Sequence, residues 1–78
     1  MATVEERLKK IIKDQFDIDD KEFVPYARLI EDFRADSLDL VEIQFAIAEE
    51  FHLPFGGIDI GDLLIIKDAL AYLKKHVE

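Results

Sequence analysis

Residues 37–51 read Ser-Leu-Asp-Leu-Val-Glu-Ile-Gln-Phe-Ala-Ile-Ala-Glu-Glu-Phe, and this stretch decides the fold. It contains neither glycine nor proline, and Ile43, Ile47 and Phe51 recur at intervals of four residues. Side chains at this spacing lie on one face of a helix, so the pattern predicts a single helix from residue 37 to residue 51 with one buried face.

Two further helices are predicted on either side of this stretch. Thr3 and Glu6 have capping-box spacing, and the apolar residues that follow at helical intervals predict a helix from about residue 4 to 15. Towards the end of the chain, basic residues close a second apolar repeat, where cations complement the helix dipole. The apolar residues of this last predicted helix are Ile66, Ala69, Leu70, Leu73 and Val77.

The segments between these helices lack helical periodicity. Residues 17–36 are interrupted by Pro25 and predict a long connection, with a short turn at residues 26–29. A loose segment of this length is unusual in so small a domain, so we expect six apolar side chains to pin it to the core. These are Ile18, Phe23, Val24, Leu29, Ile30 and Phe33. Proline and two glycines end the helix over 37–51, and residues 58–64 are expected to hold one short helical turn that Gly61 weakens.

Length and composition predict one compact domain over residues 1–78. Half of the 78 residues are hydrophobic, which excludes a disordered chain, and no strand-length alternation competes with the helices. The expected fold class is therefore all-α, a small antiparallel bundle of three to four helices with a long loop between the first two. A chain this short leaves little room for a large active-site cavity.

The charge of the chain restricts its partners. Eighteen acidic and ten basic residues give a net charge of −8, which repels nucleic acid and anionic lipid, so we expect basic proteins as partners. No apolar run approaches 18 residues, and nothing marks secretion, so no stable membrane association is expected.

Few side chains are available for catalysis or metal binding. Ser37 is the only serine, Thr3 the only threonine, and His52 and His76 the only histidines. No nucleophile elbow, oxyanion loop or third triad member accompanies them, and cysteine is absent. The acidic run over residues 17–20 lacks the glycine and the distal glutamate of a calcium loop. We therefore expect no enzyme, no catalytic residue and no metal site.

Ser37 stands out because of its position at the start of the central helix. Asp36 is placed to cap that helix, with Asp39 three residues further on, which leaves Ser37 at the first helical position with an outward hydroxyl. The alternative is that Ser37 itself is the cap.

The surrounding residues resemble a known family. Ala35-Asp-Ser-Leu-Asp39, followed by Val41-Glu42, Phe45 and Glu49-Glu-Phe51, resembles the segment of acyl carrier proteins that bears the 4'-phosphopantetheine attachment serine. The stretch over residues 69–73 resembles the last helix of that family. The resemblance implies that a phosphopantetheinyl transferase attaches the arm of coenzyme A to Ser37, flanked by Asp36 and Leu38. The arm's thiol then holds acyl intermediates as thioesters for fatty-acid, polyketide or specialised lipid biosynthesis, and the carrier is a cytoplasmic monomer.

The acidic residues near Ser37 predict a docking surface. Residues 35–66 contain seven acids and neither lysine nor arginine, which suits basic patches on synthases, reductases and acyltransferases. Leu38, Val41 and Phe45 fall on a second face of the helix and form either core or the apolar centre of this surface. The predicted partner-binding residues are Asp36, Leu38, Asp39, Val41, Glu42, Phe45 and Glu49.

Some features depart from the family pattern. Arg34 stands where the family usually has glycine, and it could bond the arm's phosphate or Asp36, or repel a basic partner. Residues 55–61 are glycine-rich and residues 63–66 are apolar, which adds bulk beside the expected acyl-binding channel and suggests an unusual cargo. Two alternatives stay open: a peptidyl or aminoacyl carrier, and an unmodified acidic helical adaptor.

Overall fold

The computed structural model describes residues 2–77 as an all-helical chain. Its three α-helices are α1 (Val4–Phe16), α2 (Ser37–Phe51) and α3 (Ile66–Val77). Three single-turn 3₁₀ helices, η1 (Asp20–Glu22), η2 (Phe55–Gly57) and η3 (Ile60–Leu63), lie in the connections, and no β-strand occurs in the described range. The helix predicted over residues 37–51 is confirmed, and the turn expected within residues 58–64 is η3.

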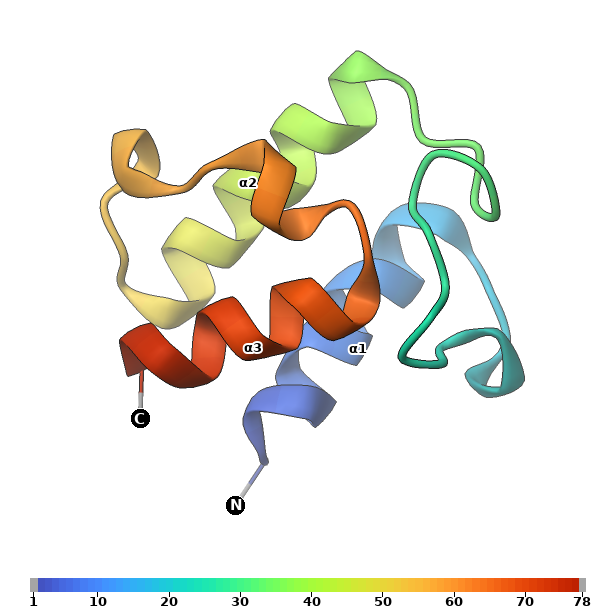
Figure 1. The fold of residues 1–78 in the computed structure, drawn as a ribbon, viewed down its shortest axis with the longest axis horizontal. Coiled ribbons are helices and arrows are strands. Elements are labelled where there is room, and N and C mark those ends of the chain that lie inside the picture. The colour runs from blue at the N-terminus through green and yellow to red at the C-terminus, as the bar shows by residue number, and fades with distance from the viewer. Residues whose placement is uncertain (1, 78) are drawn as a thin grey trace.

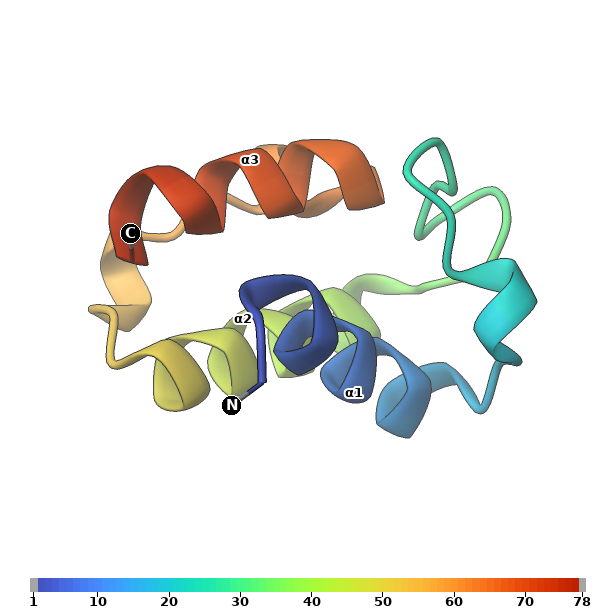
Figure 2. The ribbon, with the colours of Figure 1, turned by 90° about the horizontal axis from the view of Figure 1, so that it is seen from below.

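The helices are not all antiparallel. α1 runs against α2 and against α3, whereas α2 and α3 run in a similar direction (Figures 1 and 2). The expected antiparallel arrangement therefore does not extend to the α2–α3 pair. The physical reason is the connection over residues 52–65, which is long enough to carry the chain back along α2 before α3 begins. Within residues 2–77 this connection forms no fourth α-helix.

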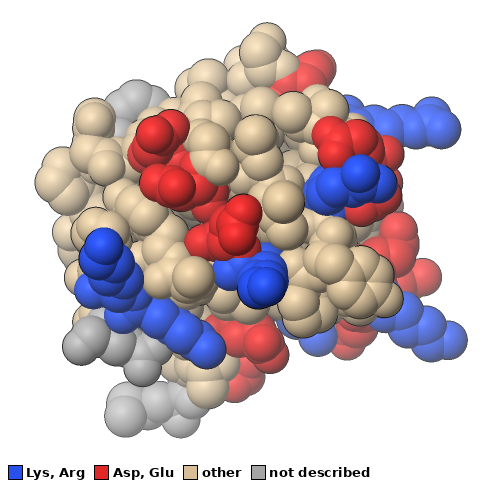
Figure 3. Space-filling view, viewed as in Figure 1, with Lys and Arg blue, Asp and Glu red and all other residues tan. Residues whose placement is uncertain are grey.

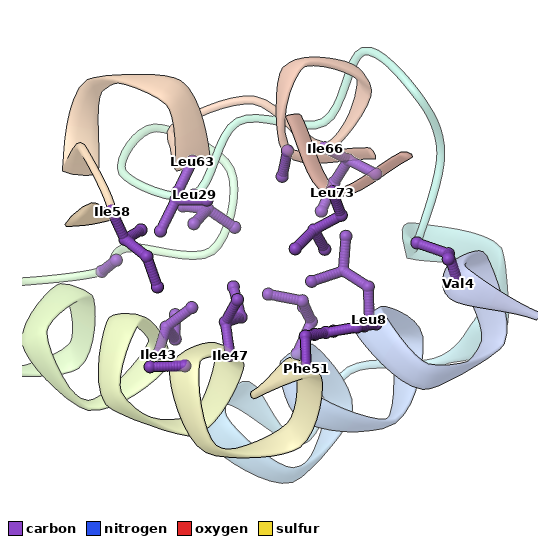
Figure 4. Packing of buried hydrophobic residues seen from close by; sticks show 14 of the residues in the cluster. Val4, Leu8, Leu29, Ile43, Ile47, Phe51, Ile58, Leu63, Ile66 and Leu73 are labelled. Carbon is purple, nitrogen blue, oxygen red and sulfur yellow. The ribbon is translucent and has the colours of Figure 1, made fainter. Parts of the chain in front are cut away.

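The core is built from all three helices and from both connections. The largest fully buried side chains are Leu8, Ile12, Leu29, Ile43, Ile47, Leu63, Ile66 and Leu73. Figure 4 shows residues of α2 facing residues of η3 and α3 across this interior. Each α-helix thus contributes one apolar face, as its spacing predicts.

The connection between α1 and α2 packs on the core through most of the expected residues. Leu29 is buried, and Ile18, Phe23, Val24 and Phe33 are partly buried against the cluster. The expectation for Ile30 is wrong, because its side chain is 42% exposed. The backbone of this segment pairs with the start of α3: the Leu29 N–H donates to the Leu64 carbonyl at 2.8 Å, and the Ile66 N–H donates to Ala27 at 3.0 Å. Leu29 takes the interior position beside that pairing, which leaves Ile30 outside.

Polar side chains hold α1 against both ends of α2. Near the end of α2, the Arg7 guanidinium donates to the Glu50 carboxylate at 2.8 Å and lies 4.3 Å from the centre of the Phe51 ring. Near its start, the Gln15 amide donates to Asp39 at 2.9 Å and to Glu42 at 3.0 Å. These contacts fix the position of α2 along α1.

Within residues 2–77, three residues other than glycine adopt left-handed backbone. Asp17 and His52 have φ values of 53° and 56° and end α1 and α2 as C-caps. Arg34, with φ of 59°, lies in the turn before α2. Left-handed backbone favours glycine, because a Cβ approaches the following carbonyl. A turn of this shape explains why glycine suits position 34.

We expect Arg34→Gly to raise the free energy of unfolding by up to about 1 kcal/mol, since relief of left-handed strain exceeds the added chain entropy of glycine. Urea denaturation at pH 7 measures this change. Lys21→Gly is the matched control, because Lys21 is an exposed cation without positive φ, and there glycine should lower stability. Equal losses for the two variants would contradict the prediction.

The pKa of the Asp39 carboxyl is lowered, first because the Gln15 amide donates to it and second because the Asp36 backbone N–H donates to it. A lowered pKa means that the ionised carboxylate stabilises the fold. Its contribution is present above the unfolded-state pKa of about 3.9 and is lost as the pH falls through the folded-state value.

Asp39→Asn should therefore melt below wild type at pH 7, and the gap should shrink as the pH falls below about 4. Thermal melts between pH 7 and pH 3 measure the gap. The control is Asp62→Asn, because Asp62 makes no hydrogen bond or ion pair within the described range through its carboxylate. A gap for Asp39→Asn that stays constant across this range would show that the carboxylate charge is irrelevant.

Candidate functional site

Asp36 caps α2, and Ser37 does not. The Asp36 carboxylate accepts the Asp39 backbone N–H at 2.8 Å, and the Asp39 carboxylate accepts the Asp36 N–H at 3.2 Å. This reciprocal pair is a complete capping box. The alternative in which Ser37 caps the helix is therefore wrong, and Ser37 is the first helical residue.

The Ser37 hydroxyl lies on the surface of the protein. Ser37 is exposed, and its side chain makes no hydrogen bond with any residue in the range 2–77. The first-turn amides of α2 lie beside it, at the positive end of the helix dipole. An anionic group attached to this hydroxyl would be stabilised there.

The turn before α2 holds Ser37 in place. Ala35 is buried, and its backbone N–H donates to the Leu29 carbonyl at 2.9 Å. The Phe33 ring packs on Phe16 of α1, with the ring centres 5.5 Å apart. The start of α2 is thus joined both to α1 and to the segment that pairs with α3.

α2 carries a second apolar face that lies outside the core. Leu38, Val41 and Phe45 are 65%, 44% and 58% exposed. The core alternative for these three residues is therefore wrong, because Ile43 and Ile47 occupy the inner face with at most 1% exposure. Large apolar side chains at such exposure, close together on one helix, are typical of a binding surface.

Acidic side chains surround this apolar face. Asp36, Glu42 and Glu49 are exposed, and Asp39 is half-buried by its contact with Gln15. Figure 3 presents the face formed by α3 and the connection before it, with α2 behind, and there acidic side chains near the middle lie beside uncharged surface and next to a basic side chain. The predicted partner-binding residues thus lie on one helix, near Ser37 and along the turns that follow it.

The two histidines lie away from Ser37. His52 ends α2 at the opposite end of the helix, and His76 lies in the last turn of α3, with its Nδ1 2.9 Å from the Tyr72 carbonyl oxygen. Within residues 2–77 no three acidic, histidine or cysteine side chains are grouped for a metal ion, and no helix is long and apolar enough to cross a membrane. The Ser37 hydroxyl therefore has no histidine base beside it.

The structure shows one polar residue that the sequence interpretation missed. Gln44 is 8% exposed, and its amide donates at 2.6 Å to the carbonyl of Ile58, which lies between η2 and η3. From α3, the Tyr72 hydroxyl donates to the adjacent Gly57 carbonyl at 2.9 Å. The helical spacing held a signal for Gln44, because it lies three residues before Ile47 on the inner face.

Comparison of the sequence with known proteins identifies a family. A family model described as "Phosphopantetheine attachment site" matches residues 6–64, a range that includes Ser37 and the whole of α2. The chain is also 43% identical, over 72 residues, to the acyl carrier protein of Nitratidesulfovibrio vulgaris (strain DSM 19637 / Miyazaki F). That alignment covers 92% of this chain and 95% of the relative. The chain therefore belongs to the acyl carrier protein family, whose members carry a covalently attached 4'-phosphopantetheine group.

Proposed function

We propose that Ser37 carries the 4'-phosphopantetheine arm and that the chain presents acyl thioesters to the enzymes of fatty-acid or related polyketide and specialised lipid biosynthesis. It does so as a monomer in the cytoplasm, with no catalytic step of its own. The observation that carries the proposal is the exposed Ser37 hydroxyl, left unbonded because Asp36 supplies the helix cap.

The residues around Ser37 fit the arm. A phosphopantetheinyl transferase would join the Ser37 Oγ to the pantetheine phosphate of coenzyme A, while the pyrophosphate bond of coenzyme A breaks and adenosine 3',5'-bisphosphate and the serine proton leave. The new phosphodiester carries one negative charge beside the first-turn amides of α2, which supports this position for it. Asp36 and Leu38 flank the attachment point, the first as cap and the second as an exposed apolar contact.

The partner surface in this proposal is the exposed face of α2. Leu38, Val41 and Phe45 form its apolar centre, and four acids form its rim. The rim consists of Asp36, Asp39, Glu42 and Glu49. Basic surfaces on the transferase, the synthases, the reductases and the acyltransferases would be steered to it, and the contacts would be weak enough to break after each step.

The acyl chain in this proposal is shielded in the interior beside α2. The side chains that support this are Ile43 and Ile47 of α2, which face Ile58 and Leu63 of the following connection. They are apolar and enclosed, so a hydrocarbon chain that parts them exchanges contact with water for contact with carbon.

Incubation with coenzyme A and a promiscuous phosphopantetheinyl transferase should add the mass of one arm to the wild-type chain, measured on the intact protein. Ser37→Ala should show no gain, because the attacking oxygen is absent. Thr3→Ala removes the other aliphatic hydroxyl and should gain mass like wild type. The proposal fails if Ser37→Ala gains the arm, or if wild type stays unmodified while a control carrier reacts; the second result would favour an acidic adaptor.

Charge reversal on the rim should slow docking. Glu42→Lys and Glu49→Lys are each expected to lower the kcat/KM of a partner enzyme by about two- to tenfold at low ionic strength. The partner enzyme is either a basic-surfaced acyltransferase or the phosphopantetheinyl transferase. The loss should shrink in high salt, because ions screen exposed charges. Glu5→Lys, the same change on exposed α1 surface, serves as the control. Equal effects of all three variants at every ionic strength would rule out a localised docking surface.

A further inference from the structure

Gln44 is the one buried polar side chain in the described part of the chain. It lies on the inner face of α2, where Ile43 and Ile47 are its close neighbours along the helix. A buried amide loses its hydrogen bonds to water, and only a partner within the protein offsets that loss. The partner of Gln44 is the backbone carbonyl of Ile58, at 2.6 Å.

This hydrogen bond fastens the connection over residues 52–65 to α2. The same connection is fastened to α3 by the bond from the Tyr72 hydroxyl to Gly57, so two consecutive carbonyls are held from two helices. The Gln44 bond is buried and the Tyr72 bond is exposed. Only the Gln44 bond therefore lies on the interior side of the connection.

The connection over residues 52–65 is the part of the structure around the core that is best able to move. Its regular structure consists of two 3₁₀ turns, η2 and η3, whose hydrogen bonds are weaker than those of α-helix. A Cβ placed on Gly56 would meet no atom within 4 Å, so that side of the turn is open. Segments of this kind open at low free energy compared with the helices of the core.

A chain that parts α2 from this connection at the level of Gln44 separates the Gln44 amide from the Ile58 carbonyl. A saturated hydrocarbon chain offers no acceptor, so the amide donor would be left buried without a partner. A chain with an oxo, hydroxyl or amide oxygen near this depth would replace the lost carbonyl. Sites that bond a polar group discriminate strongly against analogues that lack it.

We propose that Gln44 determines the cargo class of this carrier, by donating a hydrogen bond to an oxygen substituent on the acyl chain and thereby favouring oxygenated over saturated chains. This rests on the proposed function, because the cargo must be tethered near the start of α2. Ser37 and Gln44 lie on the same helix, seven residues and therefore about 10 Å apart along its axis.

The test compares two thioesters of equal chain length, hexanoyl and 3-hydroxyhexanoyl, each attached to the full chain by the transferase from its coenzyme A derivative. The melting temperature of each loaded form is measured against the form with the bare arm. In wild type, the 3-hydroxyhexanoyl form should melt about 4 °C or more above the hexanoyl form. Gln44→Met, which keeps the volume and removes the donor, should abolish or reverse that difference. Tyr72→Phe removes only the exposed hydrogen bond to Gly57 and should preserve the difference in melting temperature.

A second measurement avoids any effect of substitution on folding. In the wild-type chain, the side-chain amide proton and nitrogen signals of Gln44 should shift differently with the two cargoes, and should exchange with water faster in the hexanoyl form. Equal melting shifts in wild type and Gln44→Met, or identical Gln44 signals with both cargoes, would overturn the proposal for Gln44 alone. Failure of the arm to attach to Ser37 would overturn this proposal and the carrier function together.

Discussion

The cap of α2 is the interaction on which the site depends. Because the Asp36 carboxylate accepts the Asp39 amide, the helix begins one residue earlier than it would with a serine cap, and Ser37 enters the first turn. If serine were the cap, its hydroxyl oxygen would accept a hydrogen bond from a backbone amide of the first turn. The exchange of roles between two adjacent residues thus converts a structural hydroxyl into an exposed one, next to amides that favour a negative charge.

The position of that cap is fixed by backbone pairing rather than by α2 itself. Ala35 bonds Leu29, and Leu29 bonds Leu64 just before α3, so the chain segments that precede α2 and α3 are tied in series. The left-handed turn at Arg34 directs the chain from this pairing into the helix. Strained backbone of this kind persists only where the surrounding structure holds it in place. The burial of the next residue, Ala35, helps to hold this turn.

The sequence predicted those features that rest on unbroken periodicity. Both ends of α2 were predicted at the correct residue, because its 15 residues include neither glycine nor proline and Pro54, Gly56 and Gly57 follow soon after it. In the irregular segment no period distinguishes Leu29 from Ile30, and only the pairing with α3 decides which one is buried. The direction of α3 relative to α2 depends on the path of residues 52–65, which local pattern does not encode. Gln44 was missed because the inner face was identified from apolar spacing alone, to which a polar side chain does not contribute.

Gln44 also shows why a carrier would place a directional bond inside an apolar core. A core boundary closed only by apolar contacts would admit any chain of suitable volume. The reason is that the hydrophobic effect is non-directional and scales with the apolar area removed from water. A core boundary closed by one buried hydrogen bond opens at a penalty that depends on whether the entering group can accept that hydrogen bond instead. In the proposed cargo site, Ile43, Ile47 and Leu63 would respond to the length of a cargo, and the Gln44 amide would respond to its chemistry. Under this proposal, the same connection would complete the core of the unloaded protein and discriminate among the molecules that displace it.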